Sequence, residues 1–180
     1  VPVKTVATAH ADDDFAQYQK LGDLKTWNIY SPLMAPVSLR QEWLELKDED
    51  PFDYACVERK IPSSSYLKAS FDVQAAQTRN GSLQIEFLDE KGIACTRIEL
   101  NKEGMIRVKN GARYGKVMPY QADQTYRFEA TLDTQHRQLN LTVSIRDAEG
   151  KTLQSKSTRR IFFAPVQQIE RIRFRTGDLR

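Results

Sequence analysis

Apolar and polar residues alternate along most of the chain from Trp43 onward, and no other feature restricts the possible folds as much. Successive side chains of a β-strand point to opposite faces of the sheet, so a period of two predicts strands with one face against a core. The clearest alternating runs are 66–73, 83–87, 126–132 and 139–145. We expect these four strands to form the centre of a hydrophobic core.

Short turns that contain glycine separate the alternating runs. Glycine readily adopts the positive φ angles of tight hairpins, so neighbouring strands are expected to be antiparallel and joined by short links. The expected turns are Asn80-Gly81, Glu90-Lys91-Gly92, Lys102-Glu103-Gly104, Asn110-Gly111 and Ala148-Glu149-Gly150. Strands at intervals of roughly 8–12 residues predict an all-β fold, a two-sheet antiparallel sandwich of the jelly-roll kind, concanavalin A-like or laminin-G-like.

The length of 180 residues fits one β-sandwich domain, 1–180. Its first part, 1–42, has few alternating runs, and we predict an irregular segment that wraps the sandwich. Helix is scarce, and helical turns are expected only over 13–21, where Asp12 or Asp13 can cap them, and near 164–168.

The charges are nearly balanced, and this excludes one class of partner. There are 27 Lys and Arg residues against 24 Asp and Glu, a net charge of +3, and both signs are mixed along the chain. Nucleic-acid-binding proteins instead cluster their basic residues, so no nucleic-acid partner is expected. No stretch approaches the roughly 20 apolar residues of a membrane helix, so no membrane span is expected either. The chain begins with Val1 rather than Met, which predicts a processed protein or a piece of a longer one.

Two cysteines, Cys56 and Cys95, lie in expected strands and are compatible with one disulfide or with two free thiols. A domain of this size does not need a disulfide to fold, so free thiols are the favoured alternative. Two cysteines and two distant histidines have no spacing typical of a metal site.

No catalytic residue is predicted. Jelly-roll glucanases carry their acid and base on one strand as an E-x-D-x-x-E run, and this run does not occur in the chain. Tyr66-Leu67-Lys68-Ala69 matches a strand of jelly-roll alginate lyases, but the arginine-rich and Gln-x-His strands of that family are missing. His10 and His136 both fall in expected loops, so no histidine base lies in a sheet.

Glycan-binding sandwiches stack aromatic side chains on sugar rings and fix the hydroxyl groups with polar residues. Candidates for ligand binding outside the alternating core strands are Trp27, Tyr30, Arg113, Tyr114 and Tyr120. The loop 110–116 is the best of these, because glycines flank an aromatic residue and a cation. The alternatives are an ordinary hairpin for this loop and a core position for Trp27.

Three arginines, Arg171, Arg173 and Arg175, alternate with apolar residues and therefore share one sheet face. Such a stripe can bind uronate or sulfate groups, because a guanidinium group forms bidentate contacts with an anion. The favoured alternative is pairing with carboxylates of neighbouring strands. The expected partners are Glu58, Glu86, Glu99 and Glu129.

A calcium site near the N-terminus is a further hypothesis. Asp14, in the run Asp12-Asp13-Asp14, and Asp178 offer the oxygen ligands that calcium prefers. Six or more ligands are needed, and the sequence has no loop of fixed spacing that would supply them. Helix capping and solvated charge are the favoured alternative.

Several motifs resemble a known kind of module, the concanavalin A-like sandwich that follows a sialidase-type (BNR-repeat) β-propeller in secreted polysaccharide-degrading proteins of Bacteroidetes-type bacteria. The motifs are Asp13-Asp14-Phe15, Trp27-Asn28-Ile29-Tyr30-Ser31-Pro32, Leu44-Glu45-Leu46-Lys47-Asp48 and Asp53-Tyr54-Ala55. The runs 81–89 and 126–133 are also similar to laminin-G-like sandwiches in general.

The resemblance implies an exported protein, periplasmic or extracellular, with a catalytic domain beside this one. It transfers no catalytic residue to this chain. The predicted function is therefore a non-catalytic accessory or carbohydrate-binding domain of a glycan-processing protein. The alternative is a polysaccharide hydrolase or lyase of jelly-roll type.

Overall fold

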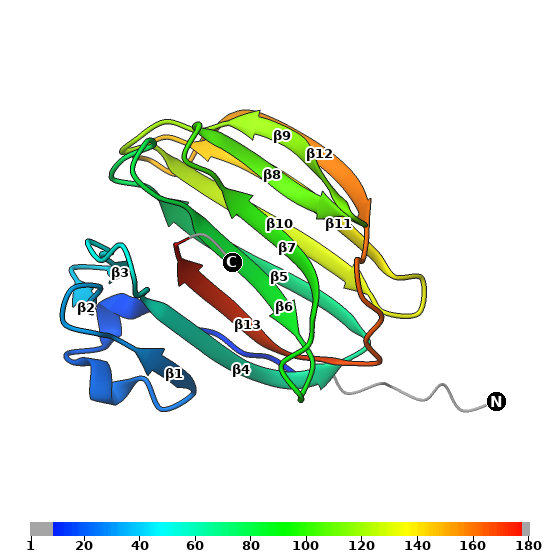
Figure 1. The fold of residues 1–180 in the computed structure, drawn as a ribbon, viewed down its shortest axis with the longest axis horizontal. Coiled ribbons are helices and arrows are strands. Elements are labelled where there is room, and N and C mark those ends of the chain that lie inside the picture. The colour runs from blue at the N-terminus through cyan, green and yellow to red at the C-terminus, as the bar shows by residue number, and fades with distance from the viewer. Residues whose placement is uncertain (1–8, 178–180) are drawn as a thin grey trace.

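Antiparallel strands build nearly all of the computed structural model, which describes residues 9–177 (Figure 1). The larger sheet has the order β1 (Trp27–Tyr30), β4 (Cys56–Ser64), β13 (Ile169–Thr176), β6 (Leu83–Leu88), β7 (Ala94–Leu100), β8 (Met105–Asn110) and β9 (Arg113–Pro119). The smaller sheet has the order β12 (Thr152–Ile161), β11 (Gln138–Arg146), β10 (Thr125–Asp133) and β5 (Tyr66–Gln74). A separate hairpin joins β2 (Val37–Arg40) to β3 (Trp43–Leu46).

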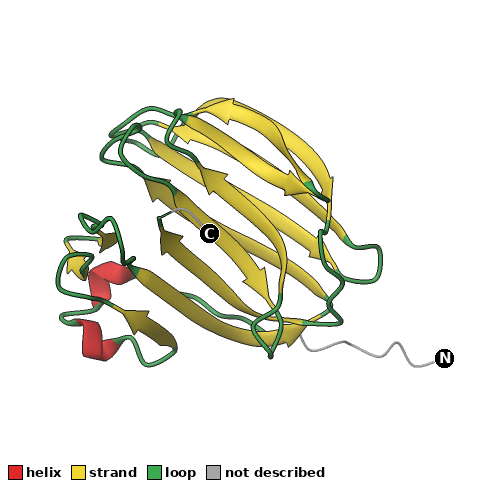
Figure 2. Ribbon diagram, in the orientation of Figure 1, coloured by secondary structure: helices red, strands yellow, loops and turns green. Residues whose placement is uncertain are grey.

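The seven-stranded sheet packs face to face against the four-stranded sheet, and the β2–β3 hairpin lies to one side of both (Figure 1). Within residues 9–177, helix is limited to η1 (Phe15–Gln17) and η2 (Leu21–Asp23), two single 3-10 turns beside that hairpin (Figure 2). The predicted two-sheet sandwich is thus confirmed. The described part of the chain contains no helix with the length and apolarity that a membrane span needs.

The hydrophobic core fills the space between the two large sheets. Ile85 and Phe87 of β6 face Phe128 of β10 and Leu141 of β11, and all four side chains are buried. The ring of Phe71 on β5 stacks on Phe128 with centroids 5.5 Å apart. Burial of each such side chain contributes about 1.5–3 kcal/mol. Three of the four strands expected from alternation, β6, β10 and β11, therefore supply buried side chains to the core, whereas β5 is an edge strand whose inward side chains are only partly buried.

The N-terminal segment differs from the irregular wrap that we expected. Residues 27–30 pair with β4 as an edge strand of the large sheet, and 37–40 form half of the small hairpin. Strands of four residues are too short to show a period of two, which is why the sequence pattern missed them. These elements enclose a second core cluster of Ala35, Val37, Ala55 and Val57.

The helical turns expected over 13–21 are confirmed in part, as η1 and the start of η2, and no helical turn forms at 164–168. The Asp14 carboxylate accepts the backbone N–H of Ala16, and the Asp23 carboxylate accepts those of Gln19 and Lys20. Aspartate side chains that bond to nearby backbone groups compete with the hydrogen bonds of a continuing helix. Two short 3-10 turns therefore form here and neither continues into a longer helix.

Candidate functional site

One face of the seven-stranded sheet points away from the core and carries mostly charged side chains. Antiparallel pairing places residues that lie directly across neighbouring strands on the same face. Two such rows cross the sheet. The first row is Asn28, Glu58, Arg173, Glu86 and Arg97. The second row is Tyr30, Cys56, Arg175, Gln84, Glu99, Arg107 and Lys116. Together with Lys109, Tyr114 and Arg171, which lie two residues along their strands from members of these rows, they form what we call the charged face.

Glu86 lies at the centre of the charged face and is only 1% exposed. Its Oε2 accepts hydrogen bonds from Nε and Nη2 of Arg97, at 3.1 and 2.9 Å. Its Oε1 accepts from Nε and Nη2 of Arg173, at 3.2 and 3.0 Å. Charge-assisted bonds of this kind are about twice as strong as neutral ones. Two guanidinium groups thus share one carboxylate, which leaves an excess positive charge around it.

A second ion pair lies beside the first. Glu99 is 4% exposed, and its two oxygens accept from Nε and Nη2 of Arg107 at 2.9 and 3.0 Å. The Arg107 guanidinium also lies over the ring of Tyr114, 4.2 Å from its centroid. The Tyr114 hydroxyl accepts a hydrogen bond of 3.2 Å from Nη1 of Arg97. Tyr114 therefore links the two ion pairs into one network.

Both arginines of this network stay charged. Burial by itself lowers the pKa of Arg97, but its hydrogen bond to Tyr114 and the charge of Glu86 outweigh burial, and the pKa is raised. The hydrogen bond to Glu99 is the main cause of the raised pKa of Arg107. The positive charge of the network is therefore constant over all physiological pH values.

Lys109 lines this region, and none of its described contacts is with a carboxylate. Its Nζ lies over the ring of Phe163, 4.6 Å from the centroid, and the Arg97 guanidinium lies 5.3 Å from the same centroid. The backbone N–H of Phe163 donates to the carbonyl of Cys95, which fixes the ring beside β7. Cation–π contacts of this kind are worth about 0.5–2 kcal/mol, so the amine is positioned without being neutralised.

These side chains line a hollow of about 420 Å³ on the charged face. Its walls are mainly polar, and its residues are Gln84, Arg97, Glu99, Asn101, Lys102, Glu103, Arg107, Lys109 and Tyr114. Binding sites for small ligands commonly have volumes of roughly 300–1,000 Å³ and a few fixed polar groups. The hollow has the size and the donors to hold one or two sugar rings.

The hairpin at 110–113 places Tyr114 at this site. Gly111 has φ 60°, as the tight turn requires, and the Asn110 side chain accepts the backbone N–H of Ile161. Tyr114 is the second residue of β9, and its ring lies against the guanidinium group of Arg107 on β8. Arg113, the first residue of β9, is exposed. Of the predicted loop residues, Tyr114 alone joins the network described above.

Tyr120 is not an exposed platform for a ligand. It is 5% exposed, and its hydroxyl donates to the carbonyl of Asn101 at 2.6 Å. Burial is the main cause of its raised pKa. The sequence placed Tyr120 outside the alternating strands, but the ring closes the end of the core and satisfies a backbone carbonyl there.

Trp27 and Tyr30 share strand β1 and have opposite environments. Trp27 packs between Phe15 and Phe174, with ring centroids 5.7 and 6.3 Å away, so the core alternative for Trp27 holds. Tyr30 is exposed on the charged face, and its ring lies 5.2 Å from that of Tyr54. Tyr30 is therefore at the far end of the charged face from the hollow.

Two of the four glutamates that were expected to pair with the arginine stripe, Glu58 and Glu86, do form ion pairs with it. Arg171 lies 3.7 Å from Glu58 and also donates to the carbonyl of Glu90, and Arg173 bonds Glu86. Arg175 instead lies over the ring of Tyr54 at 3.7 Å. Of the other two expected partners, Glu99 pairs with Arg107 of β8, and Glu129 belongs to the other sheet.

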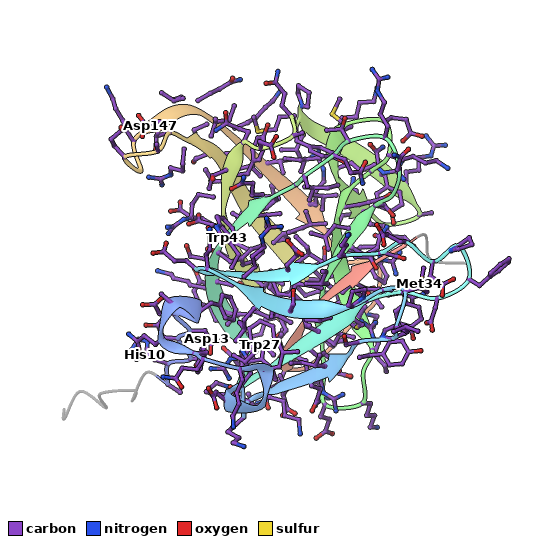
Figure 3. The ribbon with its side chains drawn as sticks, turned by 90° about the vertical axis from the view of Figure 1, so that its left-hand side faces the viewer. His10, Asp13, Trp27, Met34, Trp43 and Asp147 are labelled. Atoms are coloured by element: carbon purple, nitrogen blue, oxygen red, sulfur yellow. The ribbon has the colours of Figure 1, made fainter. Side chains whose placement is uncertain are left out.

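The calcium hypothesis gains no support from the described residues, among which no group of three or more His, Cys, Asp or Glu side chains is placed to hold an ion. Asp14 caps η1, and Asp178 lies outside the described residues. Asp13, at the same end of the molecule as Trp27, pairs with Arg59 at 2.7 Å (Figure 3). These contacts agree with capping and charge pairing.

Both cysteines are free thiols, as favoured above. Burial raises the pKa of Cys56, on the charged face, to about 11. Burial raises the pKa of Cys95, in the core, to about 12. Neither thiol is ionised at neutral pH, so neither is a nucleophile.

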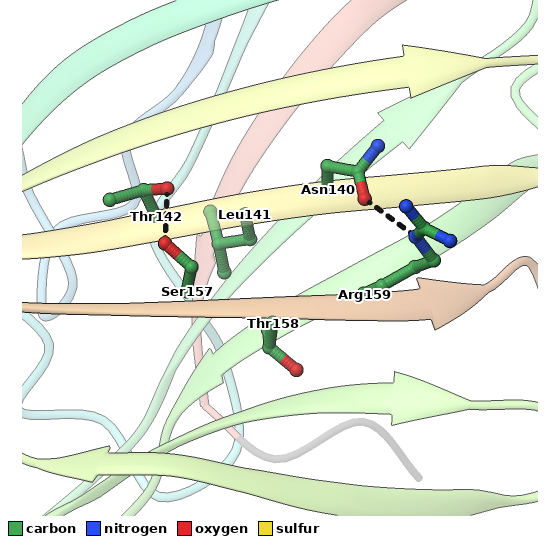
Figure 4. A pocket seen from close by; sticks show the side chains of 6 residues that line it. All are labelled: Asn140, Leu141, Thr142, Ser157, Thr158 and Arg159. Atoms are coloured by element: carbon green, nitrogen blue, oxygen red, sulfur yellow. Dashed lines mark hydrogen bonds between the residues drawn. The ribbon is translucent and has the colours of Figure 1, made fainter.

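The outward face of the four-stranded sheet offers only an open depression. Residues of β11 and β12 line it, namely Asn140, Leu141, Thr142, Ser157, Thr158 and Arg159. Short polar contacts already join these strands, Thr142 with Ser157 at 2.8 Å and Arg159 with Asn140 at 3.1 Å (Figure 4). Because this depression has no aromatic side chain and no surplus of donors, we place the candidate site on the charged face.

Sequence reasoning missed Arg97, Arg107 and Lys109, and it named Glu86 and Glu99 only as expected partners of the arginine stripe. The available signal was complementary charge in successive hairpins, because short turns between β6, β7 and β8 fix the register that brings each glutamate opposite an arginine.

Comparison with known proteins agrees with this architecture. A family model described as Sialidase-like, CBM domain matches residues 27–180. A solved sialidase is 53% identical with a TM-score of 0.85, over 96% of this chain and 15% of the sialidase chain, so the present chain spans a small part of that protein. Comparison with curated protein sequences gives no match.

More distant structures share the fold alone. A Bacillus licheniformis β-glucanase is 14% identical over 92% of this chain and 83% of its own, with a TM-score of 0.56. The Ulex europaeus lectin I, in complex with the methyl glycoside of α-L-fucose, is 8% identical over 85% of this chain and 92% of its own, with a TM-score of 0.52. The family match covers most of the chain and agrees with the resemblance seen in its motifs. The chain belongs to the Sialidase-like, CBM domain family.

Proposed function

We propose that this chain is a non-catalytic carbohydrate-binding module whose glycan occupies the hollow on the charged face. The observation that carries the proposal is the network around Tyr114, in which two ion pairs with buried carboxylates hold arginine donors in fixed positions beside an aromatic ring. Donors that are fixed before binding lose little conformational entropy when a sugar arrives. Family membership supports the same class of function.

The two buried carboxylates of the charged face, Glu99 in the wall of the hollow and Glu86 beside it, argue against catalysis. A glycosidase needs one carboxyl group as proton donor and a second as base or nucleophile. Both oxygens of Glu86 and both oxygens of Glu99 already accept from guanidinium groups. Glu86 thus accepts four hydrogen bonds, and Glu99 is held in a bidentate pair with Arg107, so neither is placed as a proton donor. Glu103, the other carboxylate at the hollow, is exposed at its rim, so it is not paired with a second free carboxylate there. The hydrolase or lyase alternative is supported only by likeness of fold to the β-glucanase.

Within a longer protein, the module would serve an adjoining catalytic domain. The chain corresponds to 15% of the length of the sialidase that it resembles, which supports a role as an accessory part. An exported glycan-processing protein, periplasmic or extracellular, fits this role.

The experiment is a screen of the 180-residue chain against plant, algal and host polysaccharides, with binding and product release measured on the same samples. We expect saturable binding of at least one glycan without release of reducing ends or unsaturated uronates. Release that persists after repurification would overturn the non-catalytic proposal, and absence of binding throughout the panel would overturn the binding role.

A further inference from the structure

We infer that the hollow selects an anionic saccharide, one that carries a carboxylate or a sulfate ester, and that Lys109 and Arg107 hold its charged group. This inference rests on the proposed function and names the class of its ligand. It is drawn from the charges of the face, from how the carboxylates there are used, and from the position of one lysine.

Cations outnumber carboxylates on the charged face. The seven cations are Arg97, Arg107, Lys109, Lys116, Arg171, Arg173 and Arg175. The three carboxylates are Glu58, Glu86 and Glu99. The face therefore has four more positive than negative charges, whereas the whole chain has a net charge of +3. The rest of the chain is close to neutral, so the surplus is concentrated on this sheet.

The carboxylates of this face do not neutralise the cations of the hollow. Glu86 divides its two oxygens between Arg97 and Arg173, and Glu99 gives both of its oxygens to Arg107. The rim adds Lys102 and Glu103, one charge of each sign. Two positive charges near the hollow are therefore not balanced by these carboxylates. One comes from the two arginines that share Glu86, and the other is the charge of Lys109.

Two donors are in place for an incoming anion. The Lys109 amine is held over Phe163, and its described contacts include no carboxylate. On Arg107, the bonds to Glu99 use Nε and Nη2, and Nη1 has no described hydrogen bond. Both residues line the same hollow. A carboxylate or sulfate there would form charge-assisted bonds, which are stronger than the bonds of a neutral sugar hydroxyl.

Partial burial strengthens this preference. Cations taken out of water without a counter-ion are costly, and an anionic ligand removes that cost, whereas a neutral sugar leaves it. Water screens exposed charges, but it screens charges in a hollow much less. The surplus charge therefore favours an anionic glycan over a neutral glycan of the same shape.

The test compares ligands that differ only in charge. Calorimetric titrations would use oligogalacturonides and their methyl esters, 3′-sialyllactose and its methyl ester, and sulfated and desulfated galactan oligosaccharides. We expect at least one charged ligand to bind about tenfold more tightly than its uncharged partner, or about 1.4 kcal/mol. The carboxylate and sulfate pairs distinguish the two kinds of anion, and affinity should fall as NaCl is raised.

The matched variants are Lys109→Met and Lys156→Met. Lys109 holds no carboxylate, so its replacement leaves no buried charge unpaired, and methionine keeps most of its apolar stem. We expect Lys109→Met to abolish the preference for the charged ligand, and Lys156→Met on the exposed β12 to keep it. Equal binding of charged and uncharged ligands, or a preference unchanged in Lys109→Met, would overturn the inference but leave the carbohydrate-binding role standing. Absence of binding to every ligand, in this test and in the screen, would overturn both.

Discussion

The two outward sheet faces of this sandwich are both polar, yet they are built in different ways. On the four-stranded sheet, short hydroxyl side chains and scattered charges lie in solvent, and the Arg127–Asp72 pair is 37% and 36% exposed. On the seven-stranded sheet, long arginine and glutamate side chains interlock until Glu86 is almost fully buried. An exposed pair is worth about 0–1 kcal/mol, whereas breaking a buried pair costs about 3–5 kcal/mol. The side chains of a polar face are held in fixed positions only where charges on neighbouring strands pair with one another.

The largest effect should come from removing the central carboxylate of the charged face. Glu86→Ala leaves Arg97 and Arg173 without their shared partner, and the free energy of unfolding should fall by about 3–5 kcal/mol. Urea denaturation followed by fluorescence measures this change. A loss below about 1 kcal/mol would show that the charged face is as weakly coupled as the other face.

The next effect concerns binding. Tyr114→Ala should weaken binding of the best glycan from the screen by about 1–3 kcal/mol, because loss of an anchoring aromatic is the costly change at such sites. Tyr114→Phe keeps the ring under Arg107 and removes only the hydroxyl bond to Arg97, so its loss should be smaller. Tyr66→Ala, an exposed tyrosine on β5, is the control and should bind as the wild type does. Equal losses at Tyr66 and Tyr114 would contradict the difference between the faces.

Thiol chemistry gives a further measure of how tightly the charged face is packed. Cys56 lies within it with a pKa of about 11, so it should resist iodoacetamide at pH 8, while a cysteine introduced by Ser70→Cys on the exposed face of β5 should react readily. Reaction of Cys56 should accelerate as pH rises toward 11. Comparable rates at the two positions at pH 8 would mean that the charged face opens freely.

The same thiol predicts how stability depends on pH. Cys56 ionises near 9.0 in the unfolded chain and near 11 in the folded chain. The stability contributed by its neutral form is complete below pH 9 and is lost as pH rises toward 11. Cys56→Ser should reduce this alkaline loss, measured as the midpoint of urea unfolding between pH 8 and 11. An identical pH profile in wild type and variant would contradict the burial of the thiol.

The smallest effect should be found on the four-stranded sheet. A double-mutant cycle on Asp72 and Arg127 should give a coupling of about 0–1 kcal/mol that disappears in high salt, because both side chains are more than a third exposed. A coupling above about 2 kcal/mol would remove the contrast between the two faces.

The contrast also explains what the sequence was able to predict. Phe128 and Leu141 follow a period of two, and a single physical cause, burial against the opposite sheet, produces that period. Burial of Glu86 depends on arginines from two other strands, and no local pattern contains that information. Tyr120 was misplaced for a related reason, since its environment is set by Asn101, nineteen positions earlier in the chain.

The central claim, that glycan binds on the charged face, is tested most directly by following backbone amide shifts of the ¹⁵N-labelled chain during titration with the tightest ligand of the screen. We predict saturable shifts at Arg97, Arg107, Lys109 and Tyr114 and unchanged signals at Thr142 and Ser157. Saturable shifts confined to the outward face of the four-stranded sheet, or shifts that never saturate at any residue, would contradict it.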